Sequence, residues 1–222
     1  MTVRIQSMQG GRGEASFFSD DFSATLPNIK LNYLPISSNT STLSLVLGGL
    51  QANAGALGAT NFVCLIPFNV PGARNRSQFV QFTWAAQVNG IEAGACVMAN
   101  NDGQQIQTAG GPGVNQLYSF VLASAGNGGF SIRKVTNSVI TTLLALGAAT
   151  FAIGDVVRCE ARIAAGGGSV TLEGFRNGVS VGSVVDAAVP VHITGMPGML
   201  HRSASVAGAT FRWDNFSCGR LP

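Results

Sequence analysis

The chain has 222 residues, a length that suits a single β-sandwich domain whose core can stabilise it without metals or crosslinks. Only 10% of the residues are charged, against about 25% in an average soluble protein, and such surfaces are common where neighbouring subunits cover them. The basic residues behind the net charge of +3 are spread singly, with no run longer than Arg133-Lys134, so the clustered stripe that nucleic-acid binding needs is missing.

Residues 1–15 differ from the rest of the chain. They are polar and glycine-rich around Gln9-Gly10-Gly11-Arg12-Gly13, and they lack the apolar stretch and cleavage site of a secretory signal. No stretch approaches the roughly 18 uninterrupted apolar residues of a membrane span. We expect 1–15 to form an N-terminal arm that packs against a neighbouring subunit, or alternatively adds an edge strand to its own sheet, and 16–222 to form the β-sandwich domain.

Short runs with β-strand character follow one another, separated by clusters of Gly, Asn, Pro or Ser. In the first half they are LNYLPI (31–36), TLSLVL (42–47), FVCLIPF (62–68), QFVQFTWAAQV (78–88), ACVMAN (95–100), LYSFVLASA (117–125) and FSIRKV (130–135). In the second half they are VITTLLAL (139–146), VVRCEARIA (156–164), SVTLEGF (169–175), VSVGSVV (179–185), GMLHRSA (198–204) and ATFRWDNF (209–216). The pattern predicts an all-β, two-sheet antiparallel β-sandwich with under about a tenth of the residues helical.

Alternation within the runs assigns side chains to faces, because successive side chains of a strand point to opposite sides of the sheet. In 156–164, Arg158, Glu160 and Arg162 fall on the outward face, where we expect Glu160 to form an ordinary cross-strand ion pair. Glu92 and Glu173 stand alone. The residues predicted for the core are Phe82, Trp84, Val157, Cys159, Ile163, Phe211 and Trp213.

Two further local features bear on the fold. Asn177-Gly178 lies between two β runs and predicts a hairpin with a type I′ turn, which needs positive φ at both central residues. The four cysteines, Cys64, Cys96, Cys159 and Cys218, lie in apolar runs without metal-binding spacing. We expect them to be buried thiols, although two disulfides remain an alternative outside the cell.

The order of these motifs resembles a known family. An opening DDF (Asp20, Asp21, Phe22) is followed by FAIGDVVRCEARI, SVTLEGFRNGVSVGSVVD, GMPGML and a closing FRWDNF. This succession is similar to the concanavalin A-like lectin and glucanase superfamily, specifically its laminin-G-like jelly rolls, over about residues 16–217. The resemblance implies a jelly roll in which the first and last strands meet, and it covers lectins, glucanases, adhesion modules and virion components.

Few residues of the sequence match the catalytic, metal-binding or sugar-binding sites that the resemblance implies. The alternating carboxylates of the glucanases are missing, and His192 and His201 lie away from any nucleophile motif, so no catalytic residue is predicted. Asp21 and Asp214, where the first and last strands would meet, are candidates for a structural Ca²⁺, with turn capping as the alternative. Tyr33 and Tyr118 are the candidates for a sugar-binding aromatic platform.

Three functions follow. The first is a non-enzymatic structural or decoration component of a virion, such as that of a phage, in which the jelly roll contacts other protein subunits and forms a homo-oligomer without a cofactor. The second is a soluble carbohydrate-binding lectin domain, and the third is a glucanase-like hydrolase. We expect a virion location for the first, or the cytoplasm when the chain is expressed without a signal peptide.

Overall fold

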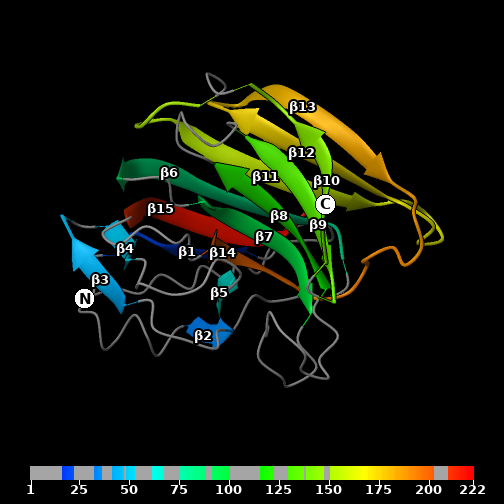
Figure 1. Ribbon diagram of the computed structural model, residues 1–222, viewed down its shortest axis with the longest axis horizontal. Helices are drawn as coiled ribbons and strands as arrows, with labels where there is room; N and C mark the ends of the chain where they lie inside the picture. Colours follow the sequence, from blue (N-terminus) through cyan, green and yellow to red (C-terminus); the bar gives the residue numbers. More distant parts are fainter. Residues whose placement is uncertain are drawn as a thin grey trace.

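A computed structural model describes residues 17–22, 33–36, 42–47, 49–53, 62–67, 76–88, 92–100, 116–122, 130–137, 139–147, 151–202 and 210–222 (Figure 1). The description covers the backbone alone at 17, 33–36, 42–46, 52–53, 62–67, 88, 100 and 202. The predicted arm, residues 1–15, lies outside the described residues, so its role stays a prediction.

The described part of the chain contains β-strands and no helix. They are β1 (Phe17–Asp20), β2 (Tyr33–Ile36), β3 (Thr42–Val46), β4 (Gly49–Asn53), β5 (Phe62–Pro67), β6 (Gln78–Val88), β7 (Glu92–Asn100), β8 (Gln116–Leu122), β9 (Ser131–Thr136), β10 (Val139–Ala145), β11 (Val156–Ile163), β12 (Val170–Arg176), β13 (Val179–Asp186), β14 (Met196–Arg202) and β15 (Thr210–Arg220). Each predicted run overlaps one of these strands, whereas β1 and β4 were not predicted because their sequences, FFSD and GLQAN, are short and alternate weakly.

The strands form two antiparallel sheets that pack face to face (Figure 1). The eight-stranded sheet has the order β13-β12-β11-β6-β15-β4-β3, with β1 paired to β15, and the seven-stranded sheet has the order β10-β9-β8-β7-β14-β5-β2. The first and last strands meet as the resemblance implies, since Asp20 lies opposite Phe216. The prediction of an all-β, two-sheet antiparallel sandwich is confirmed.

The core lies between the two sheets and contains the residues that alternation assigned to it. Trp84 is 8% exposed and Trp213 is fully buried, and the ring of Phe211 stacks on Trp84 with centroids 6.0 Å apart. The predicted core residues Phe82, Val157, Cys159 and Phe211 are also buried. Ile163 is only half-buried, because it ends β11 at the margin of the core.

Buried polar side chains connect the two sheets. The indole N–H of Trp213, on β15, donates to the backbone carbonyl of Gly94, on β7, at 2.9 Å. Gln78, on β6, donates through Nε2 to the Gly195 carbonyl at 2.7 Å and accepts from the Met98 backbone N–H at 3.0 Å. Since buried backbone groups need partners, these bonds fix how the sheets lie against each other.

The predicted hairpin at Asn177-Gly178 is confirmed. Both residues have positive φ, 50° and 83°, as a type I′ turn requires, and Arg176 pairs with Val179. The Asn177 side chain accepts from the Val156 backbone N–H at 2.8 Å and donates to the Asp155 carboxylate at 2.8 Å. The turn is therefore attached to the start of β11, which holds β11, β12 and β13 together as one unit.

The thiols of Cys96, Cys159 and Cys218 are free and buried, as expected for those three residues. The side chain of Cys64 lies outside the description. Among the described residues, no helix is long and apolar enough to cross a membrane.

Candidate functional site

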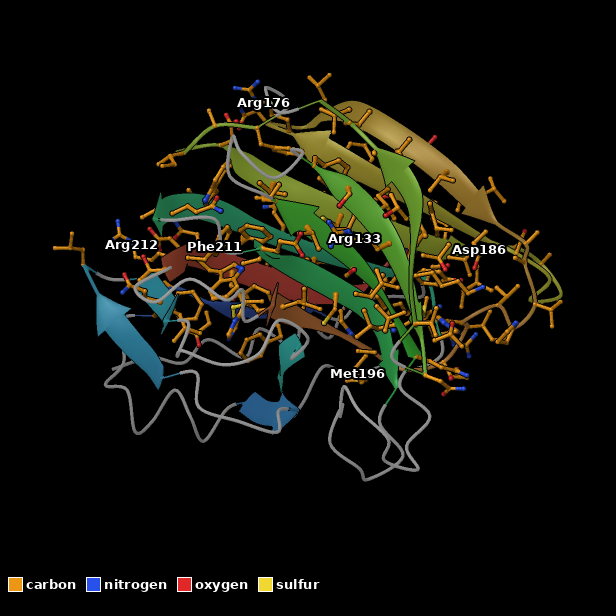
Figure 2. All side chains as sticks on the ribbon, viewed as in Figure 1. Arg133, Arg176, Asp186, Met196, Phe211 and Arg212 are labelled. Carbon is orange, nitrogen blue, oxygen red and sulfur yellow. The ribbon has the colours of Figure 1, made fainter. Side chains whose placement is uncertain are left out.

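The outward face of the seven-stranded sheet is apolar and buried over β7, β8, β9 and β14. Cys96, Leu117, Val121, Val135 and Leu200 form a second apolar cluster there, and each is fully buried. On the same face the Arg133 guanidinium binds both carboxylate oxygens of Glu92, at 2.8 and 3.1 Å, so Glu92 does not stand alone as the sequence suggested (Figure 2). A buried apolar face offers few groups to a polar ligand.

The outward face of the eight-stranded sheet is polar instead. Register places Glu160 of β11 opposite Glu173 of β12, and Arg158 and Arg162 lie on the same face two residues to either side of Glu160. Ser180, on the edge strand β13, contacts Glu173. We call Arg158, Glu160, Arg162, Glu173 and Ser180 the outer polar cluster.

Glu160 is the buried centre of this cluster. Its side chain is 6% exposed, and its two oxygens accept hydrogen bonds from Arg158 Nε, at 2.7 Å, and from Arg162 Nη2. The guanidinium of Arg158 also lies over the ring of Phe79, on β6, with 4.2 Å from its carbon to the ring centroid. The predicted cross-strand ion pair is thus corrected: both arginines lie on the strand of Glu160, because side chains two residues apart share a face.

Glu173 is in a different position from Glu160. Ser180 Oγ donates to Glu173 Oε1 at 2.6 Å, and among the described residues Glu173 forms no ion pair. Sequence alternation missed this opposition of two carboxylates, since it requires the register of β11 against β12. The length of the turn between Ile163 and Val170, which are paired, was the signal that could have given it.

Several polar groups of the cluster face solvent. The side chain of Arg162 is 51% exposed and that of Arg158 is 29% exposed, and each donates through a single nitrogen to Glu160. A guanidinium carries five N–H donors, so most donors of both arginines, and Oε2 of Glu173, have no hydrogen-bond partner among the described residues. The cluster offers hydrogen-bond donors and acceptors whose positions β-strands fix.

The predicted platform residue Tyr118 is not on the surface. It is fully buried, and its hydroxyl donates to Asp186 at 2.6 Å and accepts from the His192 backbone N–H at 3.2 Å. Lys134 Nζ lies 2.8 Å from the same carboxylate, and Figure 2 shows Asp186 at the end of β13. Tyr118 therefore helps to anchor the segment after β13, and it cannot stack on a sugar.

Burial and hydrogen bonds shift the pKa values of Tyr118, Asp186 and His192, which lie together in the interior. Burial, with the hydrogen bond to Asp186, raises the pKa of Tyr118 above its usual range. Burial also acts to raise the pKa of Asp186, but hydrogen bonds from Lys134 and Tyr118 outweigh it and hold the pKa below its ordinary value. Desolvation is the main cause that lowers the pKa of His192. The group is a neutral tyrosine joined to an ion pair in the interior.

The other predicted site residues have local roles or lie outside the description. Asp214 Oδ1 accepts from the Asn215 backbone N–H at 2.8 Å, and Asp20 Oδ1 accepts from the Phe22 backbone N–H at 2.8 Å, both as turn-capping contacts. Asp21 is exposed beside them. The described residues contain no group of three or more His, Cys, Asp or Glu side chains that could hold a metal, and a Ca²⁺ at Asp21 and Asp214 stays a prediction. The side chain of Tyr33 is outside the described residues.

No protein-family model matches the sequence, and no curated protein matches it significantly. Solved structures do match the fold. A legume lectin-like domain from Entamoeba histolytica is 8% identical with a TM-score of 0.53, covering 92% of this chain and 97% of that one. Peanut lectin bound to a nine-residue peptide is 10% identical with a TM-score of 0.52, covering 93% and 97%.

Enzymes share the fold as well. The alginate lyase Aly36B is 11% identical with a TM-score of 0.50, covering 94% of this chain and 98% of that one. Identities this low establish the architecture and leave the activity to the site itself. The chain therefore has the two-sheet antiparallel jelly-roll fold of these lectins and lectin-like domains, the fold that its motifs indicated.

Proposed function

We propose that the chain is a non-catalytic, lectin-like module that binds glycans through the outer polar cluster. The observation that carries the proposal is the row Arg158, Glu160 and Arg162 on β11, facing Glu173 on β12, on the outward polar face of the eight-stranded sheet. The lectin-like neighbours of the fold support this choice of ligand class over the virion role that the sequence favoured.

The chemistry of the cluster suits a ligand rich in hydroxyl groups. A sugar hydroxyl both donates and accepts, so a pair of neighbouring hydroxyls is matched by a guanidinium edge on one side and a carboxylate oxygen on the other. Arg162 offers the donors and Glu173 Oε2 the acceptor. Because Glu160 and Phe79 hold Arg158, and Glu160 holds Arg162, little side-chain freedom is lost on binding.

The same contacts disfavour hydrolysis. Retaining and inverting glycosidases need one carboxyl group that donates a proton and a second that attacks the sugar or activates water. Both oxygens of Glu160 already accept from guanidiniums, and Ser180 holds one oxygen of Glu173. Glu160 is bound by arginines of its own strand and Glu173 by Ser180 of β13, so neither carboxyl group is left to donate a proton to a ligand while the other attacks.

A glycan array with the wild-type chain and three variants tests this function. Arg162→Ala and Glu173→Gln should each weaken binding to the best glycan by about tenfold, the loss of a good hydrogen bond to a charged group. Arg220→Ala is the control, since Arg220 is exposed on β15 outside the cluster. Binding unchanged in both cluster variants, or release of reducing sugar that Glu173→Gln abolishes, contradicts the proposal.

The virion location and the part of residues 1–15 in assembly remain predictions. Deleting 2–15 and measuring incorporation into particles tests them: normal folding with lost assembly supports the arm hypothesis, and normal assembly contradicts it.

A further inference from the structure

One aromatic side chain lies on the outward polar face of the eight-stranded sheet. Among the aromatic residues whose side chains the structure describes, Phe175 on β12 is the only one that is not buried. It belongs to neither of the two apolar clusters, and register places it opposite Arg158 of the outer polar cluster. The face that carries the cluster therefore contains the exposed ring that the buried Tyr118 does not supply.

The guanidinium of Arg158 does not cover this ring. It lies 4.2 Å from the centroid of the Phe79 ring, on β6, and its Nε binds Glu160 at 2.7 Å. Because β6 and β12 flank β11 on opposite sides, the guanidinium of Arg158 is directed away from Phe175. An apolar ring and a polar guanidinium edge thus lie on neighbouring strands. A sugar ring has two matching parts, a face of C–H groups and an edge of hydroxyl groups.

Phe175 and Arg158 belong to a row of side chains that crosses the sheet from strand to strand. Residues that pair across a ladder share a face, so the register of the strands defines the row. We call it the transverse row, and it contains, in spatial order, Ser180 on β13, Phe175 on β12, Arg158 on β11, Gln81 on β6, Ser217 on β15 and Ser19 on β1. None of these six residues is buried. With neighbouring strands about 4.8 Å apart, the row is about 24 Å long, so a single sugar contacts only part of it.

The charges on this face suit an uncharged ligand. Arg158 is the one charged residue of the transverse row, and Glu160 offsets its charge. Beside the row, the second arginine of the cluster, Arg162, is balanced by the second carboxylate, Glu173. An acidic ligand would approach Glu173 and a basic ligand would approach the arginines, so each would meet a like charge on this face.

We propose that the ligand of the outer polar cluster is an uncharged, linear, extended glycan that lies along the transverse row, with one sugar ring stacked on Phe175. This inference rests on the proposed function. The row favours a chain over a terminal sugar, because polar groups recur on successive strands. In a straight chain of β-1,4-linked sugars each ring advances by nearly the spacing between strands, so successive rings meet successive strands.

Calorimetric titration with β-1,4-linked oligosaccharides of glucose, xylose and mannose, two to six sugars long, tests the length of the site. In at least one series the affinity should rise tenfold or more from the disaccharide to the hexasaccharide, since each added sugar reaches a further strand. Affinity that does not change with length, or no binding in any series, overturns the inference. If Arg162→Ala and Glu173→Gln still weaken binding to another glycan on the array, the proposed function stands without it.

Two variants of Phe175 test the stacking. Phe175→Leu keeps an apolar side chain but removes the ring, and should weaken binding roughly fivefold or more. Phe175→Tyr keeps the ring and should bind as the wild type does. Phe175 is partly exposed, so both variants should fold, and their thermal unfolding checks this. A folded Phe175→Leu variant with unchanged affinity overturns the assignment of Phe175.

A double variant tests the direction of the chain. Gln81→Ala with Ser217→Ala removes polar groups two and three strands away from Phe175, and should weaken hexasaccharide binding roughly tenfold while disaccharide binding stays unchanged. The matched control is Thr141→Ala with Thr142→Ala, which removes exposed hydroxyls from β10 of the other sheet and should change neither affinity. Equal losses for both ligand lengths, or no loss for either, overturn the placement of the chain along the row.

Discussion

Glu160 and Glu173 lie directly opposite each other in the β11–β12 ladder, and of the two it is Glu160 that pairs with described cations, Arg158 and Arg162. Like charges directly opposite in a sheet destabilise it. Arg158 and Arg162 offset the charge of Glu160, but no described cation pairs with Glu173. Residues that reduce the stability of a fold are often retained because they bind a ligand. The unpaired charge of Glu173 is therefore consistent with a role in binding.

Glu173→Gln should raise stability slightly while it weakens glycan binding. The amide removes the repulsion with Glu160, worth about 0.2–1 kcal/mol, and its oxygen can still accept from Ser180. Urea unfolding and glycan titration of the same preparation measure both effects. A variant that loses stability and keeps its affinity would show that Glu173 has only a structural role.

The two tryptophans should respond differently to replacement by phenylalanine. Trp213→Phe removes the buried hydrogen bond to the Gly94 carbonyl that joins the two sheets, at a cost of about 1 kcal/mol beyond the loss of volume. Trp84→Phe is the matched control, because the buried Trp84 indole nitrogen has no hydrogen-bond partner among the described residues. Chemical denaturation of both variants measures the difference. Equal losses would mean that the bond between the sheets contributes nothing measurable.

Asp186→Asn should be strongly destabilising. Lys134 and Asp186 have side chains that are 8% and 2% exposed, so the variant leaves a buried ammonium without its counter-charge, at a cost of about 3–5 kcal/mol. Arg162→Ala breaks an ion pair whose guanidinium is 51% exposed, and should cost under about 1 kcal/mol. Thermal unfolding of the two variants side by side checks the contrast, and similar losses would contradict it.

Stability should fall between about pH 6.5 and pH 4 because of His201. Desolvation by burial lowers its pKa from 6.5 to about 4, and within the described part of the chain neither ring nitrogen has a hydrogen-bond partner. The unfolded chain therefore binds the proton first, so stability is full above the unfolded value and falls as the pH drops toward 4, by about 3 kcal/mol. Urea unfolding across this range measures it. His201→Leu should flatten the slope, leaving the smaller part that His192 contributes with the same sign.

Much of the fold could be predicted because period-two alternation and turn residues are local signals. The hairpin at Asn177-Gly178 needed two residues with positive φ, and the sequence supplies them. Tyr118 could not be placed in the same way. β8 is buried on both faces, with Leu117 and Tyr118 both fully buried, so its run LYSFVLASA has no polar alternation that separates inside from outside.

The candidate site depended on register, which alternation alone does not give. Glu160 was correctly assigned to an outward face, but its neighbours across the ladder were unknown, and its ion pairs were expected from another strand. A shift of one residue would move Glu173 to the other face of the sheet. The pairing of Ile163 with Val170 fixes the register, and with it the opposition of the two carboxylates.

The most direct test of the central claim is a map of backbone amide chemical shifts while the best glycan from the array is titrated into the wild-type chain. We expect the shift changes to concentrate on the outward residues of β11 and β12, at Arg158, Glu160, Arg162 and Glu173, and to extend to Ser180 on β13. Changes confined to the seven-stranded sheet, or no saturable change with any glycan, would contradict the assignment of the outer polar cluster as the binding surface.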